Sequence, residues 1–195
     1  AAAYQLLALV AALRHMARKE SLPSDLPPVS ILKPVRGLDP HFYEAIRSHA
    51  VQDYPDYEIL FGVADPADPA VAQIHRLMQE LPDRRIRLVT STTQAANGKV
   101  GVLIDLAREA SCPLLVVSDS DIRVPRGYLR RIVGPLEDPA VGLVTCLYGA
   151  RSDHWPARWE AIGIATDFAP STLVAPLVGL RGFGLGSRCY SAPWT

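Results

Sequence analysis

Short apolar runs alternate with stretches of helical periodicity along most of this 195-residue chain. The runs are rich in Val, Ile, Leu and aromatic residues, which favour β-strands, and they lie at Val29–Lys33, Tyr57–Val63, Ile86–Val89, Pro113–Val117 and Val141–Cys146. Between two of them, apolar residues recur at helical spacing at Val71, Ile74, Leu77, Met78 and Leu81. This alternation predicts an α/β domain, in which helices cover both faces of a mostly parallel sheet.

Two Asp-Pro pairs mark expected helix starts. Asp39 and Asp68 each precede a proline, and an Asp N-cap followed by Pro at the first helical position is a common way to begin a helix. The first of these helices is expected to turn four apolar residues inward: Phe42, Ala45, Ile46 and Ala50. Three further helices are predicted, over Val100–Ala107, Tyr128–Val133 and Trp159–Phe168.

The N-terminal residues 1–20 leave two interpretations open. An apolar run from Ala1 to Leu13 is followed by basic residues, namely Arg14, His15, Arg18 and Lys19. The run is shorter than the roughly 20 apolar residues that span a bilayer. It is either the remnant of a membrane anchor, whose basic end would face the cytoplasm, or a soluble amphipathic helix. A proline-rich linker follows at 21–28, the main domain is expected over 29–187, and 188–195 form an atypical tail.

Charge and cysteine content exclude several classes of protein. The 20 basic and 20 acidic side chains give a formal net charge of zero, which argues against a broad electrostatic surface for nucleic acid. The three cysteines have no metal-binding spacing and fit buried thiols better than a disulfide framework. The five histidines form no tight cluster with cysteine, so a structural zinc site is not expected.

Polar residues follow four of the predicted strands. Lys33-Pro34 ends the first strand, Asp65 ends the second, Lys99 lies beyond the third, and Asp119 with Asp121 follows the fourth. Parallel strands bring their carboxyl ends to one edge of a sheet, where ligands of α/β proteins bind. These side chains are therefore expected to lie together.

Each of these residues also has a structural interpretation. Asp68 is most simply a helix cap, whereas Asp65 fits either a ligand contact or the turn that Asp-Pro favours. Lys99 stands near a helix start, where the helix dipole disfavours a cation by roughly 0.3–1 kcal/mol. It is either a solvated lysine or a partner for a bound anion.

Asp119 and Asp121 form a D-x-D motif in the sequence SDSDIRV. Two like charges this close repel each other, so something must compensate them. A divalent cation is the best candidate, because Mg²⁺ typically takes one or two carboxylates together with substrate phosphates. Mn²⁺ or Mg²⁺ is therefore the expected cofactor.

Several segments together resemble glycosyltransferase family 21. They are VSILKPVRGLDP, DYPDYEILFGVADPADPA, NGKV, SDSDIRV and VGLVTCLYGA, and the resemblance runs from Val29 to about Ser187. Family members include ceramide glucosyltransferases and bacterial hopanoid-biosynthesis glycosyltransferases, and VTCLYGA and IATDFAPSTLVA resemble the hopanoid type more closely. The resemblance implies a GT-A fold (Rossmann-like, nucleotide-diphospho-sugar transferase) and an inverting enzyme. It also implies a UDP-sugar donor, a divalent metal and a lipid acceptor such as ceramide or a hopanoid, with the active site on the cytoplasmic face of a membrane.

By the same motif match, roles can be carried onto individual residues. Asp65 would bind the uridine, and Pro34 with its neighbours would line the uracil pocket. Lys99 would lie near the diphosphate, and Asp119 with Asp121 would serve the metal and the diphosphate. The glycine-rich stretch at 179–187 would form part of the sugar or acceptor wall.

The chain also departs from the family pattern. The third acidic motif, which carries the proposed base, and the (Q/R)xxRW motif are not found downstream of the glycine-rich stretch, and Gly101 replaces a residue that is often polar. We therefore expect this stretch of chain to bind a sugar nucleotide without transferring the hexosyl group, glucose or N-acetylglucosamine, by itself. Two other readings stay open: a metal-dependent nucleotidyltransferase, and a non-catalytic nucleotide-binding or interaction module.

Overall fold

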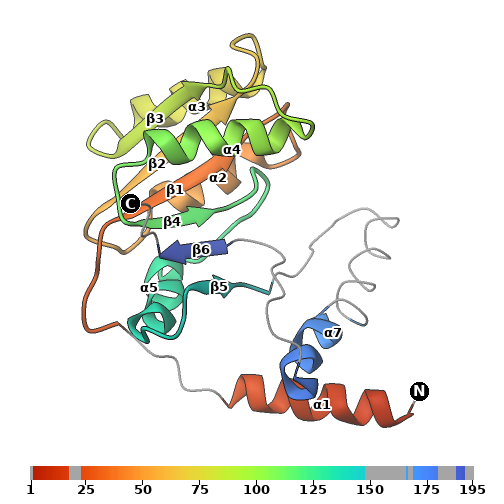
Figure 1. Cartoon of the computed structure of the whole chain (residues 1–195). Helices are drawn as coiled ribbons and strands as arrows, with labels where there is room; N and C mark the ends of the chain where they lie inside the picture. Colours follow the sequence, from red (N-terminus) through yellow and green to blue (C-terminus); the bar gives the residue numbers. More distant parts are fainter. Residues whose placement is uncertain (1, 18–22, 148–165, 167–168, 180–187, 192–195) are drawn as a thin grey trace. The chain divides into compact units, whose positions relative to one another are not determined.

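The computed structural model describes residues 2–17, 23–147, 166, 169–179 and 188–191 (Figure 1). The chain divides into two compact units, one made of 1–20 with 145–186 and the other of 21–144 with 187–195. The larger unit contains the sheet and all of the candidate site residues predicted from the sequence.

The larger unit is built on one sheet with the strand order β3-β2-β1-β4-β6-β5 (Figure 1). Its strands are β1 Val29–Pro34, β2 Tyr57–Val63, β3 Arg85–Thr90, β4 Leu114–Val117, β5 Leu143–Thr145 and β6 Arg188–Ser191. Strand β1 pairs in parallel with β2 and β4, β2 pairs in parallel with β3, and β6 runs antiparallel to β4. The predicted α/β fold with a mostly parallel sheet is confirmed.

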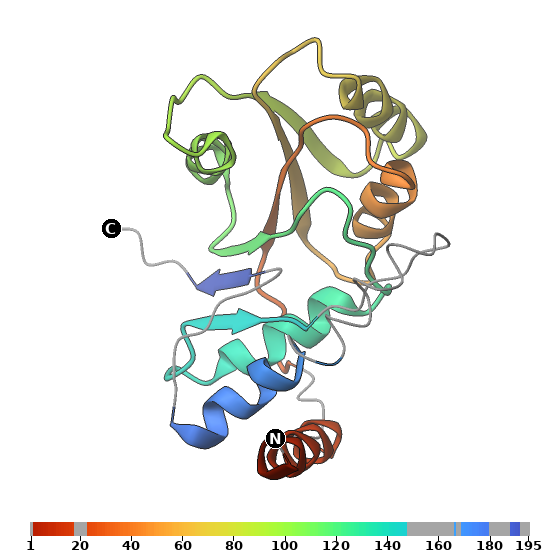
Figure 2. The same cartoon turned by 90° about the vertical axis from the view of Figure 1, so that its right-hand side faces the viewer.

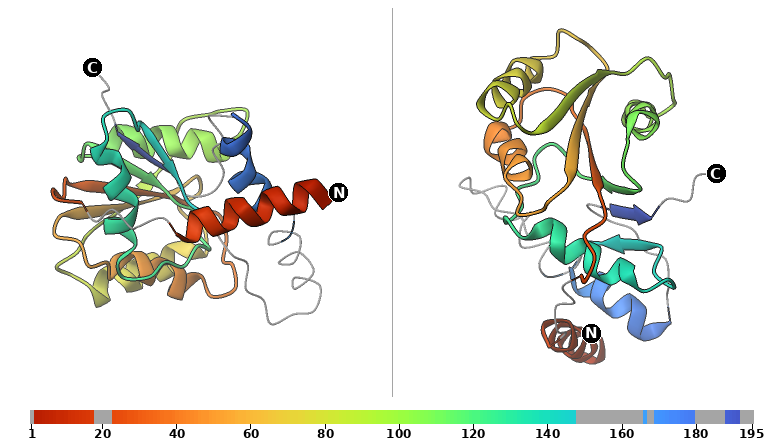
Figure 3. Two further views of the ribbon diagram at one scale, coloured as in Figure 1. Left: turned by 90° about the horizontal axis from the view of Figure 1, so that it is seen from below. Right: turned by 90° about the vertical axis from the view of Figure 1, so that its left-hand side faces the viewer.

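Helices cover both faces of this sheet. Helix α4 lies on one face, and α2 and α3 lie on the other (Figures 2 and 3). The helices of this unit are α2 Phe42–Ala50, α3 Ala70–Glu80, α4 Gly98–Glu109, α5 Tyr128–Val133 and the short 3₁₀ helix η1 Gly134–Glu137. All six residues of β1 and all seven of β2 are buried. This explains why both strands read as continuous apolar runs instead of alternating patterns.

The packing of α4 on the sheet is unusually close at one point. Leu32, Leu60 and Leu115 of the sheet form a buried cluster with Val102 and Leu106 of α4. Gly62 of β2 lies beneath this helix, and a Cβ atom at that position would stand 2.4 Å from Val102 Cγ1. No side chain fits there, so Gly62 sets how near α4 can approach the strands.

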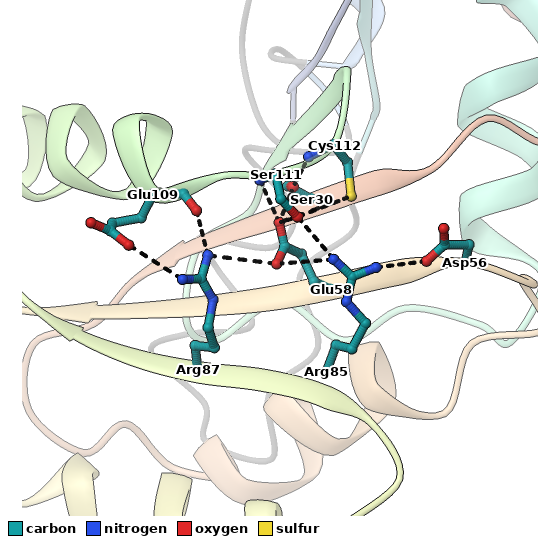
Figure 4. Close-up of polar contacts among 8 residues, drawn as sticks. All are labelled: Ser30, Asp56, Glu58, Arg85, Arg87, Glu109, Ser111 and Cys112. Carbon is teal, nitrogen blue, oxygen red and sulfur yellow. Dashed lines mark hydrogen bonds and ion pairs between the residues drawn. The ribbon is translucent and has the colours of Figure 1, made fainter.

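A charged cluster closes the amino-terminal edge of the sheet, opposite the predicted ligand edge (Figure 4). The carboxylate of Glu58 is 3% exposed and accepts hydrogen bonds from the Ser30 hydroxyl at 2.6 Å and from the backbone and hydroxyl of Ser111 at 2.7 and 2.8 Å. Arg85 and Arg87 of the edge strand β3 each approach Glu58 Oε2 to 3.6 Å. Burial opposes ionisation most strongly, but these hydrogen bonds and Arg87 together hold the pKa of Glu58 below its usual value.

The smaller unit contains the helices α1 Ala2–Met16, α7 Ala169–Val174 and the 3₁₀ helix η3 Ala175–Val178. Small residues on one side of α1, Ala8 and Ala11, are buried against Val174 of α7. Several apolar side chains of α1 remain exposed, namely Leu6, Leu9, Val10, Leu13 and Met16. Within the described ranges, no helix combines the length and hydropathy needed to cross a bilayer.

One sequence prediction differs from the structure, one strand was not predicted, and one predicted helix lies almost wholly outside the described residues. Helix α2 begins at Phe42, after His41 in the left-handed conformation (φ 63°), so Asp39 is not its N-cap as predicted. The carbonyl of Asp39 accepts from the Phe42 N–H instead, which closes a turn before the helix. Strand β6 was not predicted, and the predicted helix Trp159–Phe168 lies outside the described residues apart from position 166.

Candidate nucleotide and metal site

The carboxyl ends of β1, β2, β3 and β4 meet at one edge of the sheet. Pro34 pairs with Gly62, and Leu32 pairs with Val117, so the strands end nearly level. Backbone hydrogen bonds continue the ladder just past the strands, from Val35 N–H to the Gly62 carbonyl at 2.8 Å and from Ser118 N–H to the Leu32 carbonyl at 3.1 Å. The residues that follow these strands are therefore brought to a common edge.

Asp119 and Asp121 lie in the turn that leaves β4, and both are exposed. The Asp119 carboxylate accepts a hydrogen bond from Lys99 Nζ at 2.6 Å. Among the described residues, no group of three or more His, Cys, Asp and Glu side chains is arranged to hold a metal ion. Two exposed hard carboxylates nevertheless suit a cation that completes its shell with phosphate oxygens and water, so the donor set fits Mn²⁺ or Mg²⁺.

Lys99 occupies the second position of α4. The Asn97 side chain caps this helix by accepting from the Lys99 N–H at 3.0 Å. The lysine ammonium therefore stands at the positive end of the helix dipole, as predicted, and the anion beside it here is the Asp119 carboxylate. The contact is exposed on both sides, with side-chain exposures of 50% and 53%, so a phosphate group can replace the carboxylate without opening a buried site.

Asp65 and Asp68 take different places in the loop after β2. The Asp65 carboxylate accepts from the Ala67 N–H at 2.8 Å, the turn contact that Asp-Pro sequences favour, and its side chain is exposed. The Asp68 carboxylate accepts from the N–H of Ala70, the first residue of α3, and from the Gly37 N–H at 2.8 Å. Asp68 thus holds the helix start, as expected, and also links the loops that follow β1 and β2.

Pro34 is the last residue of β1 and is buried. It cannot donate a backbone hydrogen bond, and the ladder with β2 resumes at Val35. It therefore stands at the carboxyl edge of the sheet, beside the loop that carries Gly37, which the Asp68 side chain links to the loop after β2.

Hydrogen bonds to Asp105 hold the loop between β3 and α4, and they explain why Gly101 occupies a position that is often polar in the family pattern. The Asp105 carboxylate accepts from Ser91 Oγ, from Thr93 Oγ1 and from the N–H groups of Thr92 and Thr93, all within 3.0 Å. These bonds, first that of the Thr93 hydroxyl, hold the pKa of Asp105 far below its usual range. A Cβ atom at Gly101 would lie 2.4 Å from the Thr93 carbonyl oxygen, so the clamped loop leaves room only for glycine.

The sequence reasoning missed one feature of the site, a buried polar cluster beneath the acidic turn. Lys33 of β1 is fully buried, and its Nζ donates to the Asp119 carbonyl at 2.7 Å and to Ser118 Oγ at 3.3 Å. His49 of α2 lies 3.5 Å from Lys33 Nζ and 3.1 Å from Ser118 Oγ. A lone lysine inside the apolar run VSILKP was the available signal, since lysine is almost never fully buried without a specific reason.

Burial governs the ionisation of both basic groups in this cluster. It lowers the pKa of Lys33 to about 7, against the opposing effect of the carboxylates of Asp119 and Asp121. Burial, and then the nearby Lys33, lower the pKa of His49 well below its usual value. His49 is therefore neutral at physiological pH, and it accepts or donates hydrogen bonds without adding charge.

Solved structures with the same fold support the assignment of the fold class. A mannosyltransferase from Pyrobaculum calidifontis, in complex with GDP-Man and Mn²⁺, is 25% identical, has a TM-score of 0.60, and covers 76% of this chain and 45% of its own. Glucosyl-3-phosphoglycerate synthase from Mycobacterium tuberculosis, in complex with uridine diphosphate, is 17% identical with a TM-score of 0.56, covering 85% and 57%. The fold is therefore that of the GT-A glycosyltransferases, as predicted.

Comparison with known sequences identifies the family. Ceramide glucosyltransferase 3 of Caenorhabditis elegans is 36% identical over 111 residues, which are 56% of this chain and 24% of the relative. Ceramide glucosyltransferase 1 of the same organism is 27% identical over 158 residues, 80% of this chain and 34% of the relative. This chain thus spans about a quarter to a third of these curated proteins. The sequence model described as Glycosyl transferase family 21 matches residues 1–191, and the chain belongs to that family.

Proposed function

We propose that this chain carries the donor site of a glycosyltransferase that uses a UDP-sugar and Mn²⁺ or Mg²⁺. One observation supports it above the others: two exposed carboxylates, Asp119 and Asp121, stand at the carboxyl edge of the sheet with Lys99 directly beside them. A diphosphate needs a divalent cation and a positively charged side chain in this arrangement. The donor-binding domain in this proposal comprises residues 29–187.

Each residue of the site has a distinct task in this proposal. Asp119 and Asp121 hold the cation, and Lys99 transfers its ammonium contact from Asp119 to a phosphate oxygen. Asp65 accepts hydrogen bonds from the uridine, and Pro34 contributes to the wall of the base pocket. When bound, the cation stabilises the negative charge that builds on the departing diphosphate.

The acceptor in this proposal is a lipid hydroxyl, and the hexosyl group is glucose or N-acetylglucosamine. The names of the ceramide glucosyltransferase relatives support a sphingolipid acceptor such as ceramide. The alternative, a hopanoid-like acceptor, rests on the resemblance of the segments VTCLYGA and IATDFAPSTLVA alone. The reaction is an inverting transfer at a membrane, with the donor site on the cytoplasmic side. The exposed apolar side chains of α1, followed by Arg14 and His15, support association with a lipid surface.

Calorimetry with UDP tests the donor site directly. UDP is titrated into the chain with Mn²⁺, with Mg²⁺ and with a chelator, and binding is expected to need the metal. Asp119→Asn is expected to weaken metal-supported binding. Asp65→Asn is expected to weaken UDP binding by roughly 1.5–3 kcal/mol, the contribution of one charge-assisted hydrogen bond. Equal UDP affinity with metal and with chelator would exclude the metal role proposed for the acidic pair.

Two controls separate this function from its alternatives. A melting temperature that collapses in Asp65→Asn would show that the turn contact with Ala67 is the whole role of that residue. Incubation with UDP-glucose or UDP-N-acetylglucosamine and a lipid acceptor is followed by product analysis. This stretch of chain alone is expected to bind the donor without forming a glycolipid, whereas a nucleotidyl-transfer product would favour the nucleotidyltransferase reading. A chain that binds neither UDP nor UDP-sugar with metal would instead be an interaction module.

A further inference from the structure

Lys33 is a charged residue in a place that the fold alone does not require to be charged. It lies in the central strand β1, fully buried between layers of apolar side chains. Its hydrogen-bonding neighbours are uncharged groups, namely the Asp119 carbonyl, the Ser118 hydroxyl and the imidazole of His49. Burying an ammonium group without a directly paired carboxylate costs folding free energy, and apolar replacements at such positions are often neutral or stabilising.

The contacts of the Lys33 ammonium indicate a role that would justify this cost in folding free energy. Its shortest contact, 2.7 Å, is to the backbone carbonyl of Asp119, the residue whose carboxylate lies on the surface of the same turn. The Ile122 N–H donates to the same carbonyl at 3.4 Å. Lys33 therefore fixes the peptide that orients the first carboxylate of the D-x-D motif.

The remaining contacts fix the lysine itself. Ser118 connects Lys33 to His49 Nε2, and His49 Nδ1 lies 3.1 Å from the Ala45 carbonyl of α2. The ring of Tyr128, from α5, packs edge-on against His49 with 6.1 Å between centroids. The cluster thus joins a central strand, the end of β4 and two helices, so the ammonium has little freedom to move.

We propose that Lys33 is a positioning residue for the acidic pair: its Nζ holds the backbone carbonyl of Asp119 from beneath, so that Asp119 and Asp121 can face one divalent cation. This inference rests on the metal-dependent UDP binding proposed above. It assigns the lysine no contact with the nucleotide, since buried strands and the turn itself separate it from solvent.

Lys33→Met tests the proposal, because methionine preserves most of the length and volume but removes the charge and the donor. Thermal unfolding and calorimetric titration of UDP with Mn²⁺ are measured on the same samples. We expect an equal or higher melting temperature together with a loss of metal-dependent UDP affinity of about 10–100-fold, the range typical of residues that orient metal ligands. Electron paramagnetic resonance of Mn²⁺ in the presence of UDP is expected to show fewer bound ions at equal concentrations.

Leu32→Met is the matched control, because Leu32 is the buried neighbour in the same strand and belongs to the apolar cluster under α4. It is expected to leave the metal-dependent affinity unchanged. A second variant, Ser118→Ala, removes one acceptor of the ammonium and its link to His49 with a small change in volume. It is expected to weaken metal-dependent binding less than Lys33→Met does.

The outcomes distinguish this inference from the proposed function. If the unmodified chain binds no UDP with Mn²⁺, the proposed function fails before the lysine is tested. If the unmodified chain binds but Lys33→Met binds equally well, the positioning role is overturned. If Lys33→Met does not fold, the charge is needed by the fold, and unchanged binding by Ser118→Ala then also overturns the inference.

Discussion

Replacing Lys99 by methionine is predicted to change metal affinity and nucleotide affinity in opposite directions. Lys99 Nζ lies 2.6 Å from Asp119 Oδ1, so the lysine ammonium would compete with a divalent cation for the same carboxylate. Lys99→Met frees Asp119 for the cation. The same change removes the side chain that is proposed to contact the diphosphate once the nucleotide is bound.

The exposure of the ion pair sets the size of the first effect. Both side chains are about half exposed, and such pairs contribute about 0.2–1 kcal/mol. Mn²⁺ alone should therefore bind about 1.4- to 5-fold more tightly to Lys99→Met. The melting temperature should change little, since losing the pair is offset by removing a cation from a helix start, worth roughly 0.3–1 kcal/mol.

The second effect is larger. A hydrogen bond from an ammonium to a phosphate contributes about 1.5–3 kcal/mol, so UDP should bind about 10- to 150-fold more weakly at saturating Mn²⁺. Both affinities are measured by calorimetry, first with the metal alone and then with UDP. Arg47→Met is the matched control, because Arg47 also forms a half-exposed 2.6 Å pair, with Glu80, on the opposite face of the sheet from α4.

A fall in both affinities, or an unchanged UDP affinity, would contradict these two roles of Lys99. A fall in both would mean that Lys99 supports the geometry of the acidic turn instead of competing with the metal. Unchanged UDP affinity would mean that the ammonium stays on Asp119 when the nucleotide binds. The same two titrations on Arg47→Met show how much of any change comes from the lost charge alone.

Two further predictions concern stability. Glu58→Gln is expected to lower the free energy of unfolding by about 1–3 kcal/mol at pH 7. The pKa of Glu58 is lowered in the folded protein, so the carboxylate contributes its full stability above the usual pKa of 4.5 and loses it as the pH falls through the lower folded pKa. In urea unfolding, the difference in stability between the two proteins should therefore shrink below about pH 4. A difference that stays constant with pH would contradict this. Gly62→Ala is expected to lower the free energy of unfolding by about 1–3 kcal/mol, because the added methyl group overpacks the space beneath Val102. In a double-mutant cycle, Val102→Ala should recover part of that loss. Strictly additive effects would show that α4 shifts freely.

The sheet was largely predictable because its strands are buried on both faces. Continuous apolar runs located β1 and β2 to within a residue, since both strands are completely buried in the structure. Local turn chemistry was less informative. The Asp39-Pro40 pair matches a helix start, yet α2 begins only at Phe42, because His41 adopts the left-handed conformation. The sequence contains no pattern that predicts this conformation.

Strand β6 shows a different limit of the sequence. Its residues Arg188–Ser191 pair antiparallel with β4, and two of its four residues are polar or charged in a way that resembles a loop. What makes it a strand is the unpaired edge of β4, which needs hydrogen-bonding partners for its backbone groups. That requirement comes from tertiary structure and cannot be read from a four-residue segment.

The candidate site was predictable where the topology alone decides it. Knowing that strands are parallel is enough to bring the residues after β2 and β4 to one edge, and the structure places Asp65 and Asp119 there. Lys99 was predicted to be either a solvated lysine or the partner of a bound anion, and in the structure its half-exposed ammonium contacts the Asp119 carboxylate of the same chain. The contact between them depends on side-chain reach across two loops, which no spacing rule predicts.

Two lysines contact the acidic turn that carries Asp119 and Asp121, and they differ in their environment. Lys99 is exposed and can leave, so its contribution is a small free energy that the solvent already screens. Lys33 is buried and held by Ser118 and the Asp119 carbonyl, so its position stays fixed whether or not the surface contact exists. A metal–diphosphate site needs both properties, because the ligand must displace one cation while the carboxylates remain oriented. In the proposed donor site, the exchangeable Lys99 would make room for the nucleotide, and the fixed Lys33 would keep the acidic turn oriented for it.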